Sequence, residues 1–434
     1  MQSTPILKRI SFLLLPATAL AVASIVVVGV LRGPEPTGSE PAGREPARPA
    51  AAKPSDAIAR YQRTLRDAPA DHATWAALGA AYVQQARITG DPAFYPKAEG
   101  ALRRSLRLAA TGNHPAMIGM ATLANARHEF TDAVRWGERA ERIDPSSPQL
   151  YGALNDAYTQ LGDYRAATAA VARMNDLGPG VAAYTRASYE LEMHGDNAGA
   201  RRVLRQALED AYTPSDIAYC RYHLGELALH AGHLDEAARQ YRAARTADPA
   251  YVPALQGLAK TQALHGDLTA AIKSYGDVVS RVPQPQYLAE YIELLRAAGR
   301  TGAAAAQQRL LLAERKLMTD NGVVDDLGAS EYAADTGDAA GALRHARAEW
   351  ARRRSVLVAD ALAWALHLNG HDRQALRHAE QATRLGWRNA QFYRHRADIH
   401  TALGDRAAAR RDRATAHRIN PHLDPRLPAI GRAS

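Results

Sequence analysis

A glycine that recurs every 33 to 38 residues is the feature that most constrains the fold of this chain of 434 residues. Each glycine is followed, five residues later, by an alanine. The glycines are Gly162, Gly195, Gly232, Gly266, Gly299, Gly337, Gly370 and Gly404, and the alanines are Ala167, Ala200, Ala237, Ala271, Ala304, Ala342, Ala375 and Ala409. Self-similarity at such a period is typical of a protein built by stacking one small structural unit.

The residues around each glycine predict a helix, a tight turn and a second helix. Apolar residues recur at helical spacing before the glycine, as in Tyr151, Leu154 and Tyr158. Glycine supplies the left-handed conformation that ends a helix, and an aspartate that often follows it can cap the next helix. The small alanine allows the two helices to approach closely. A proline ends several of the second helices, at Pro69, Pro145, Pro179, Pro249, Pro283 and Pro421.

These units resemble the tetratricopeptide repeat (TPR), a helix-turn-helix unit of about 34 residues. Trp75, Leu78, Gly79 and Tyr82 match the opening W-x-x-L-G-x-x-Y pattern. Two later units match almost throughout, at Leu224, Gly225, Gly232, Ala237, Tyr241, Ala244 and Pro249, and then at Leu255, Leu258, Gly266, Ala271, Tyr275 and Pro283. The resemblance implies an all-α superhelical solenoid of about ten helix-turn-helix repeats over residues 56–420.

Two stretches depart from the pattern. The first unit has about seven extra residues near Ile88–Tyr95, which predict a longer loop between its helices. The repeat weakens over residues 301–354, where Ala303–Met318 is expected to form one long helix. A hinge in the solenoid or a merely degenerate repeat would explain the weak stretch. Helices at Asp56–Arg66 and Asp405–Arg418 are expected to flank the array as its caps.

Composition agrees with an all-helical protein. Alanine and arginine are abundant, aromatic residues make up only 6%, and β-branched residues are few. The single cysteine, Cys220, excludes an internal disulfide framework, a cysteine zinc site and an iron–sulfur cluster.

The N-terminal segment predicts a membrane anchor. Residues 10–31 carry no charge, follow Lys8 and Arg9, and are long enough to cross a bilayer. The charge bias favours a cytoplasmic N-terminus and an extracytoplasmic repeat domain. A secretory signal cleaved near Ala23 is the alternative. The expected organisation is an anchor or signal at 1–32, a proline-rich linker at 33–55, the solenoid at 56–420 and a tail at 421–434.

No catalytic constellation stands out. The chain lacks a Walker loop, a dinucleotide-binding glycine pattern, G-x-S-x-G and H-E-x-x-H. His223, His230 and His233, like His367, His371 and His378, could suggest a metal, but polar turn residues are the simpler interpretation. We therefore expect no enzyme activity, no cofactor and no metal.

The resemblance instead implies a concave surface lined by the first helix of each unit. Mapping that helical face gives a candidate groove of mixed charge with interleaved aromatic residues, which suits a protein partner or an extended peptide. Ordinary solvated helix positions are the alternative. The candidate residues are Asn125, Asp156, Tyr189, Glu192, Tyr222, Glu226, Lys260, Glu293, Arg296, Glu331, Trp364, His367, Arg394 and Asp398. Members of the family that bind the tails of chaperones use a clamp of lysine, asparagine and arginine. The matching positions here lack this clamp, so a chaperone tail is not an expected partner.

Basic residues are concentrated at the C-terminal end. Residues 341–434 carry 18 basic and 8 acidic side chains, in a chain whose formal charge is +9. The candidate basic patch is Arg352, Arg353, Arg354, Arg406, Arg410, Arg411 and Arg413. It could bind an anionic polymer, a lipid or nucleic acid, or simply be a solvated face; nucleic acid is not expected, because no recognition motif is present.

The sequence thus predicts a non-catalytic, membrane-anchored TPR scaffold that binds a protein or peptide in its groove. An accessory subunit of an envelope enzyme complex is a further alternative. Oligomeric state is not readable from the sequence.

Overall fold

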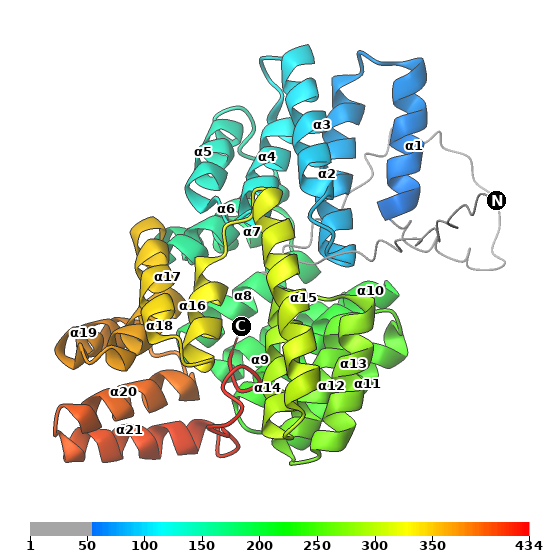
Figure 1. Cartoon of the computed structure of the whole chain (residues 1–434). Coiled ribbons are helices and arrows are strands. Elements are labelled where there is room, and N and C mark those ends of the chain that lie inside the picture. The colour runs from blue at the N-terminus through cyan, green and yellow to red at the C-terminus, as the bar shows by residue number, and fades with distance from the viewer. Residues whose placement is uncertain (1–53, 434) are drawn as a thin grey trace, which may run out of the picture.

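The computed structural model describes residues 54–433, and within this range the secondary structure is entirely helical, with 21 helices and no strand. Helix α1 (Pro54–Asp67) is followed by ten antiparallel hairpins (Figure 1). Their first helices are α2 His72–Thr89, α4 His114–Ala126, α6 Pro148–Leu161, α8 Val181–Met193, α10 Pro214–His230, α12 Val252–Leu264, α14 Pro285–Ala297, α16 Asp326–Asp335, α18 Val356–Leu368 and α20 Ala390–Ala402.

The second helices complete the hairpins and pack against the outside of the array. They are α3 Phe94–Leu108, α5 Phe130–Glu141, α7 Tyr164–Leu177, α9 Asn197–Glu209, α11 Leu234–Ala247, α13 Leu268–Arg281, α15 Thr301–Asp320, α17 Ala339–Arg352, α19 Asp372–Thr383 and α21 Arg406–Ile419. The chain is therefore a TPR-like helical solenoid, as the repeat predicts. The anchor or signal expected at 1–32 and nearly all of the linker lie outside the described residues.

The turn chemistry of the hairpins is as the sequence predicts. Gly162 has a φ of +82°, and the Asp163 carboxylate accepts a hydrogen bond of 3.1 Å from the backbone N–H of Ala166. All eight repeat glycines have positive φ, and all eight repeat alanines are at most 2% exposed. The same cap is made by Asp196, Asp267, Asp338 and Asp405.

Glycine also makes room between successive hairpins. The ring of Tyr241 packs between Gly225 of its own hairpin and Gly257 of the next. A Cβ atom added to Gly225 would lie 2.4 Å from a carbon of this ring, and one added to Gly257 would lie 2.5 Å from it. Tyr241 is fully buried, so neither contact could relax without separating the helices.

Three expectations about irregular stretches can be compared with the structure. The extra residues of the first hairpin do not form a long loop, because α2 continues to Thr89 and only Gly90–Ala93 connect it to α3. The expected long helix is α15, with 20 residues. The weak stretch also contains α16, which has only 10 residues, and a hinge there stays a prediction.

The solenoid coils until its later hairpins touch its earlier ones. In four places, the turn inside an early hairpin contacts the segment that follows a later second helix. The backbone N–H of Val324 donates to the carbonyl of Arg127 and that of Arg354 to Leu161, both at 3.2 Å. Gly195 packs on the carbonyl of Gly386, and the Asn420 amide donates to Leu229 at 3.1 Å. We call this line of contacts the seam.

The seam encloses a lumen that the first helices line. The C-terminal tail, residues 421–433, leaves α21 and runs back into the middle of the molecule, where Figure 1 shows it in red near α14 and α16. Leu427 is 2% exposed and Ile430 is fully buried, in one apolar cluster with Leu288 and Ile292 of α14. The tail is thus packed as part of the folded protein.

Candidate functional site

A cavity of about 240 Å³ lies in the lumen. The first helices α6, α8, α10, α14 and α16 supply most of its wall. The tail and single residues of other elements, such as Tyr251, Arg315 and Arg353, complete it. Six residues of the predicted groove line it: Asp156, Tyr189, Glu192, Tyr222, Glu226 and Glu331. The mapping of the concave face therefore brings these six side chains together, while the binding of a partner by them stays a prediction.

Asp156 and Arg186 form a buried ion pair in the cavity wall. The Arg186 Nε donates to one carboxylate oxygen of Asp156 at 2.8 Å, and Nη2 donates to the other at 2.9 Å. Each side chain is 6% exposed. Such a two-point pair has its charges satisfied and holds α6 against α8.

A second polar cluster surrounds Lys260. Its Nζ lies 3.6 Å from Glu226 Oε2 and 3.9 Å from Glu290 Oε1, and the lysine is completely buried. The hydroxyl of Tyr241 donates to Glu226 at 2.5 Å, and that of Tyr275 donates to Glu290 at 3.0 Å. Lys260 and Glu226 were both predicted to line the groove. Glu226 lines the lumen, whereas Lys260 lies behind the cavity wall.

The remaining predicted residues lie outside the main cavity. Trp364 and Arg394 line a smaller one of about 190 Å³, together with Leu427 and Pro428 of the tail. The ring of Trp364 stacks on His395, with ring centres 4.3 Å apart. The others make local pairs: Asn125 with the carbonyl of Ala153, Arg296 with Gln308, His367 with Asp372, and Asp398 with Arg413.

The groove residue Glu293 holds the tail. Its carboxylate accepts the backbone N–H of Ala429 at 2.9 Å and that of Ile430 at 3.0 Å. Burial raises the pKa of Glu293 to about 8, although these two donors favour the charged form. The site thus binds main-chain amides through a partly buried carboxyl group.

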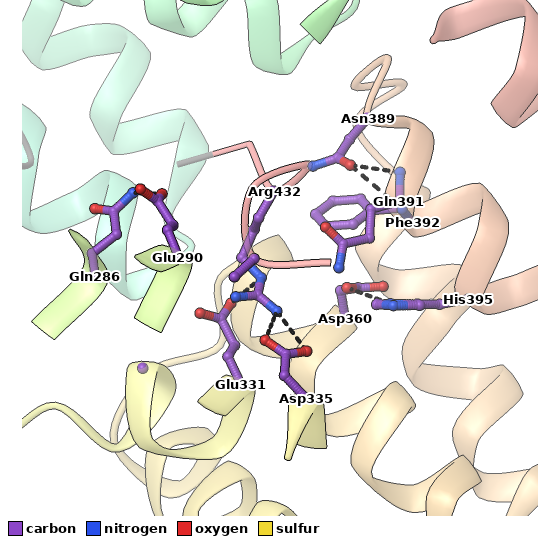
Figure 2. A network of polar contacts seen from close by, with 12 residues as sticks. Gln286, Glu290, Glu331, Asp335, Asp360, Asn389, Gln391, Phe392, His395 and Arg432 are labelled. Atoms are coloured by element: carbon purple, nitrogen blue, oxygen red, sulfur yellow. Dashed lines mark hydrogen bonds and ion pairs between the residues drawn. The ribbon is translucent and has the colours of Figure 1, made fainter. Parts of the chain in front are cut away.

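Arg432 anchors the end of the tail. Figure 2 shows its guanidinium pointing toward Glu331 and Asp335, both on α16. Nη2 donates to the two Asp335 oxygens at 2.9 and 3.2 Å, and Nε lies 3.5 Å from Glu331. Burial raises the pKa of Glu331 to about 7, against the effect of the nearby Arg432. Three carboxylates from α14 and α16 therefore meet this one segment.

One member of the predicted basic patch, Arg353, is buried. Arg353 is only 5% exposed, which corrects its grouping with exposed arginines. It donates to Glu349 and to Gln160 across the seam, and its guanidinium lies 4.9 Å from the centre of the Phe130 ring. The exposed members are Arg352, Arg354, Arg406, Arg410, Arg411 and Arg413. Anion binding by them stays a prediction.

Much of the cavity wall was missed by the sequence analysis. The missed residues include Arg186, Tyr219, His223, Tyr251, Tyr287 and Glu290. Arg186 and Tyr219 lie three residues before the predicted Tyr189 and Tyr222, on the same helical face. Mapping a wider stripe of each first helix onto the concave surface would therefore have included them. Tyr251 precedes α12, and its position depends on how the loop packs.

The histidines of interest are dispersed or paired with carboxylates. His230 Nδ1 lies 3.1 Å from Glu192, and His367 is paired with Asp372. Within residues 54–433, no group of three or more histidine, cysteine or carboxylate side chains is arranged to hold a metal ion. Over the same part of the chain, every helix is too short or too polar to cross a membrane.

Comparisons with known proteins found likeness only among solved structures. No protein-family model and no curated protein matches the chain. A thermophilic TPR protein of Thermus thermophilus is 22% identical, with a TM-score of 0.35, over 39% of this chain and 91% of its own. The Cut9–Hcn1 hetero-tetramer of the APC/C is 15% identical, with a TM-score of 0.44, over 87% and 81%.

The type IV pilus biogenesis factor PilW is 20% identical, with a TM-score of 0.39, over 46% of this chain and 92% of its own. The TPR-like architecture follows from the hairpins, turns and buried alanines of the chain itself.

Proposed function

We propose that this protein is a non-catalytic scaffold that binds a peptide segment of a protein partner in its lumen. The observation that carries the proposal is the docked tail, because Glu293 accepts two successive backbone N–H groups of that segment. Recognition of main-chain groups does not depend on side-chain identity, so another segment could use the same acceptor.

The side-chain contacts of the tail supply the specificity. Ile430 is buried in an apolar cluster and Arg432 lies against two carboxylates. A partner segment with an apolar residue two positions before an arginine would satisfy both subsites. In this mechanism the first helices form a rigid frame, and a segment becomes ordered only when it enters the lumen.

We further propose that the scaffold is tethered to a membrane by residues 10–31, with the N-terminus in the cytoplasm and the solenoid outside it. The support is the uncharged run that follows Lys8 and Arg9. A tether would raise the local concentration of the groove beside other envelope proteins. Secretion after cleavage near Ala23 is the alternative, and fractionation of cells with a C-terminal tag separates the two.

A second candidate function is binding of an anionic surface by α21. Five arginines of this last helix, Arg406, Arg410, Arg411, Arg413 and Arg418, are exposed. Such binding would weaken as salt increases, whereas apolar and main-chain contacts in the lumen would not. Sedimentation with anionic vesicles at low and high salt tests this candidate.

The lumen proposal is tested by supplying the tail in trans. In the full chain, Ile430→Asp and Arg432→Asp together should vacate the lumen. A labelled peptide with the sequence of residues 421–433 is then expected to bind this variant, as measured by fluorescence anisotropy. Wild type should bind the peptide at least ~10-fold more weakly, because its own tail competes.

Two controls make the result specific. Adding Glu293→Ala to the vacated chain should weaken binding by ~10-fold or more, because the two backbone N–H groups of the segment lose their acceptors and are left unpaired. A peptide with aspartate in place of its isoleucine and last arginine should not bind. A vacated chain that does not bind the wild-type peptide would overturn the proposal.

A further inference from the structure

The lumenal cavity has an aromatic wall. Six tyrosines line it: Tyr189, Tyr219, Tyr222, Tyr251, Tyr287 and Tyr332. The ring centres of Tyr222 and Tyr251 lie 5.9 Å apart, and their planes are steeply inclined at 72°. Rings at an angle present both faces and edges to the space that they enclose. Tyrosine faces are negative, so they attract cations.

The charges around the cavity are mainly negative. Seven carboxylates and four guanidinium groups line it. The guanidinium groups already have partners: Arg186 with Asp156, Arg353 with Glu349, Arg432 with Asp335, and Arg315 with the carbonyl of Gly328. Arg432 also lies 3.5 Å from Glu331, and within the described part of the chain none of these four arginines forms an ion pair with Glu192, Glu226 or Glu290.

The surplus carboxylates are those beside the tyrosines. Glu226 and Glu290 share one buried lysine, Lys260, whose Nζ lies 3.6 Å from Glu226 and 3.9 Å from Glu290, too far for a hydrogen bond. Glu226 Oε2 also lies 3.7 Å from His230 Nε2. Glu192 pairs with the same histidine, whose Nδ1 lies 3.1 Å away. Among the described residues, the three carboxyl groups at this end of the cavity therefore share two basic side chains, Lys260 and His230, which leaves a surplus of acidic over basic groups.

One buried oxygen in this wall lacks a hydrogen bond. Glu226 is 6% exposed, and its Oε2 has no hydrogen-bond partner among the described residues. The ring Nε2 of the neighbouring His223 is likewise unpaired. A buried carboxylate oxygen without a donor is costly, and a bound group that donates N–H would remove that cost.

The cavity is also large enough for such a group. An engineered cavity of about 150 Å³ can hold benzene, and this one has about 240 Å³. A propylguanidinium or butylammonium group, the size of an arginine or lysine side chain, would fit. A bound anion would face the surplus carboxylates, and an apolar molecule would leave Glu226 Oε2 unpaired.

We propose that the lumenal cavity is a binding site for an organic cation, an alkylammonium or alkylguanidinium group, held by the tyrosine rings and by Glu192, Glu226 and Glu290. The cation is the side chain of a peptide or a free amine, and the chemistry of the site is the same for both. The carboxyl groups that would hold the cation are not those that hold the tail, so the proposal stands without the function proposed above.

The test is calorimetric titration of the purified full chain with matched pairs of probes. Putrescine is compared with 1,4-butanediol, and acetyl-Ala-Arg-Ala-amide with its citrulline analogue, which has the same shape without the charge. Each cation is expected to bind at least ~10-fold more tightly than its neutral partner. The two pairs separate the sources, since tighter binding of the peptide identifies a side-chain ligand and tighter binding of putrescine a free amine.

Variants locate the binding. Glu226→Gln and Glu192→Gln should each weaken cation binding by ~10-fold, and Tyr222→Leu should do so more than Tyr222→Phe, which keeps the ring. Glu209→Gln, on an exposed position of α9, is the matched control and should change nothing. Circular dichroism checks that each variant is folded. Glu192→Gln is expected to disturb the fold least, because Glu192 pairs with His230 at the cavity wall and glutamine can keep that hydrogen bond.

Three outcomes would overturn the proposal. The first is equal affinity for the charged and neutral probes, and the second is the absence of binding by either cation. The third is an equal loss of affinity for the cations in Glu209→Gln and Glu226→Gln. Failure of the tail peptide to bind in trans would leave these results unchanged, so the two proposals fail separately.

Discussion

The backbone N–H of Arg354 donates a hydrogen bond of 3.2 Å to the carbonyl oxygen of Leu161, which lies in a hairpin more than five repeats earlier. Beside it, Arg353 reaches across the seam to Gln160 and covers the ring of Phe130. The hydroxyl of Tyr164 accepts the backbone N–H of Val356 at 2.8 Å. The seam therefore turns an open solenoid into a closed one, and the closure creates the lumen.

Replacing Arg353 with alanine should destabilise the protein strongly. Glu349 is 1% exposed and would keep only the more exposed Arg352 as a partner. Removing one member of a buried pair costs up to about 3–5 kcal/mol. We expect a lower midpoint of urea unfolding. Arg347→Ala, at an exposed position of the same helix, is the matched control and should lie within about 0.5 kcal/mol of wild type. Equal midpoints for the two variants would contradict the conclusion that Arg353 stabilises the seam.

Releasing the tail should expose it to protease. Ile430→Asp places a charge at a fully buried position, and the tail is expected to leave the lumen because a charge without a partner is costly to bury. Trypsin should then cut after Arg432 at least ~10-fold faster than in wild type, as measured by mass spectrometry. His422→Asp makes the same charge change at an exposed tail position and should not accelerate cleavage. Comparable rates in both variants would show that Ile430 does not hold the tail.

The raised pKa of Glu293 predicts how stability depends on pH. The carboxyl has a pKa of about 8 in the folded protein and an ordinary value of 4.5 when exposed, so the folded state binds the proton more tightly. The stability that this group contributes is complete below pH 4.5 and is lost as the pH rises through 8.

Glu293→Gln should therefore gain stability relative to wild type as the pH rises from about 5 to about 9, because glutamine cannot ionise. Urea unfolding of both proteins across this range measures the difference, and groups that they share, such as Glu331, cancel. Parallel stability curves would show that the pKa of Glu293 is not raised.

The parts of the fold that depend on neighbouring residues could be predicted from the sequence. Gly162, Asp163 and Ala167 fix a turn, a helix cap and a close helix contact within six residues, and all three act as predicted. His128 shows the limit of that pattern. It occupies the turn position of a hairpin without glycine, and it still adopts a φ of +63° while its Nδ1 lies 3.1 Å from the carbonyl of Val324.

The seam and the docked tail could not be predicted, because they depend on the accumulated rotation of many hairpins. A small change in the angle between neighbouring repeats would move Arg353 away from Gln160. The sequence marks Arg352, Arg353 and Arg354 as charged, but only the closed superhelix buries the middle one. In the same way, Glu293 was assigned to the groove, while its ligand, the tail, was expected to be a separate segment.

The register of the least regular hairpin can be tested with two adjacent alanines of α15. Ala304 is 2% exposed and packs with Ile292 and Leu295 of α14, whereas Ala305 is exposed. Ala304→Glu should lower the free energy of unfolding by about 3 kcal/mol or more, because a carboxylate would enter a tight helix contact without a partner. Ala305→Glu adds the same side chain facing solvent and should cost less than about 0.5 kcal/mol. Thermal and urea unfolding of both variants provide the measurement. The reverse order of stabilities would mean that α15 is rotated about its axis, so that the repeat assigned through Gly299 is out of register.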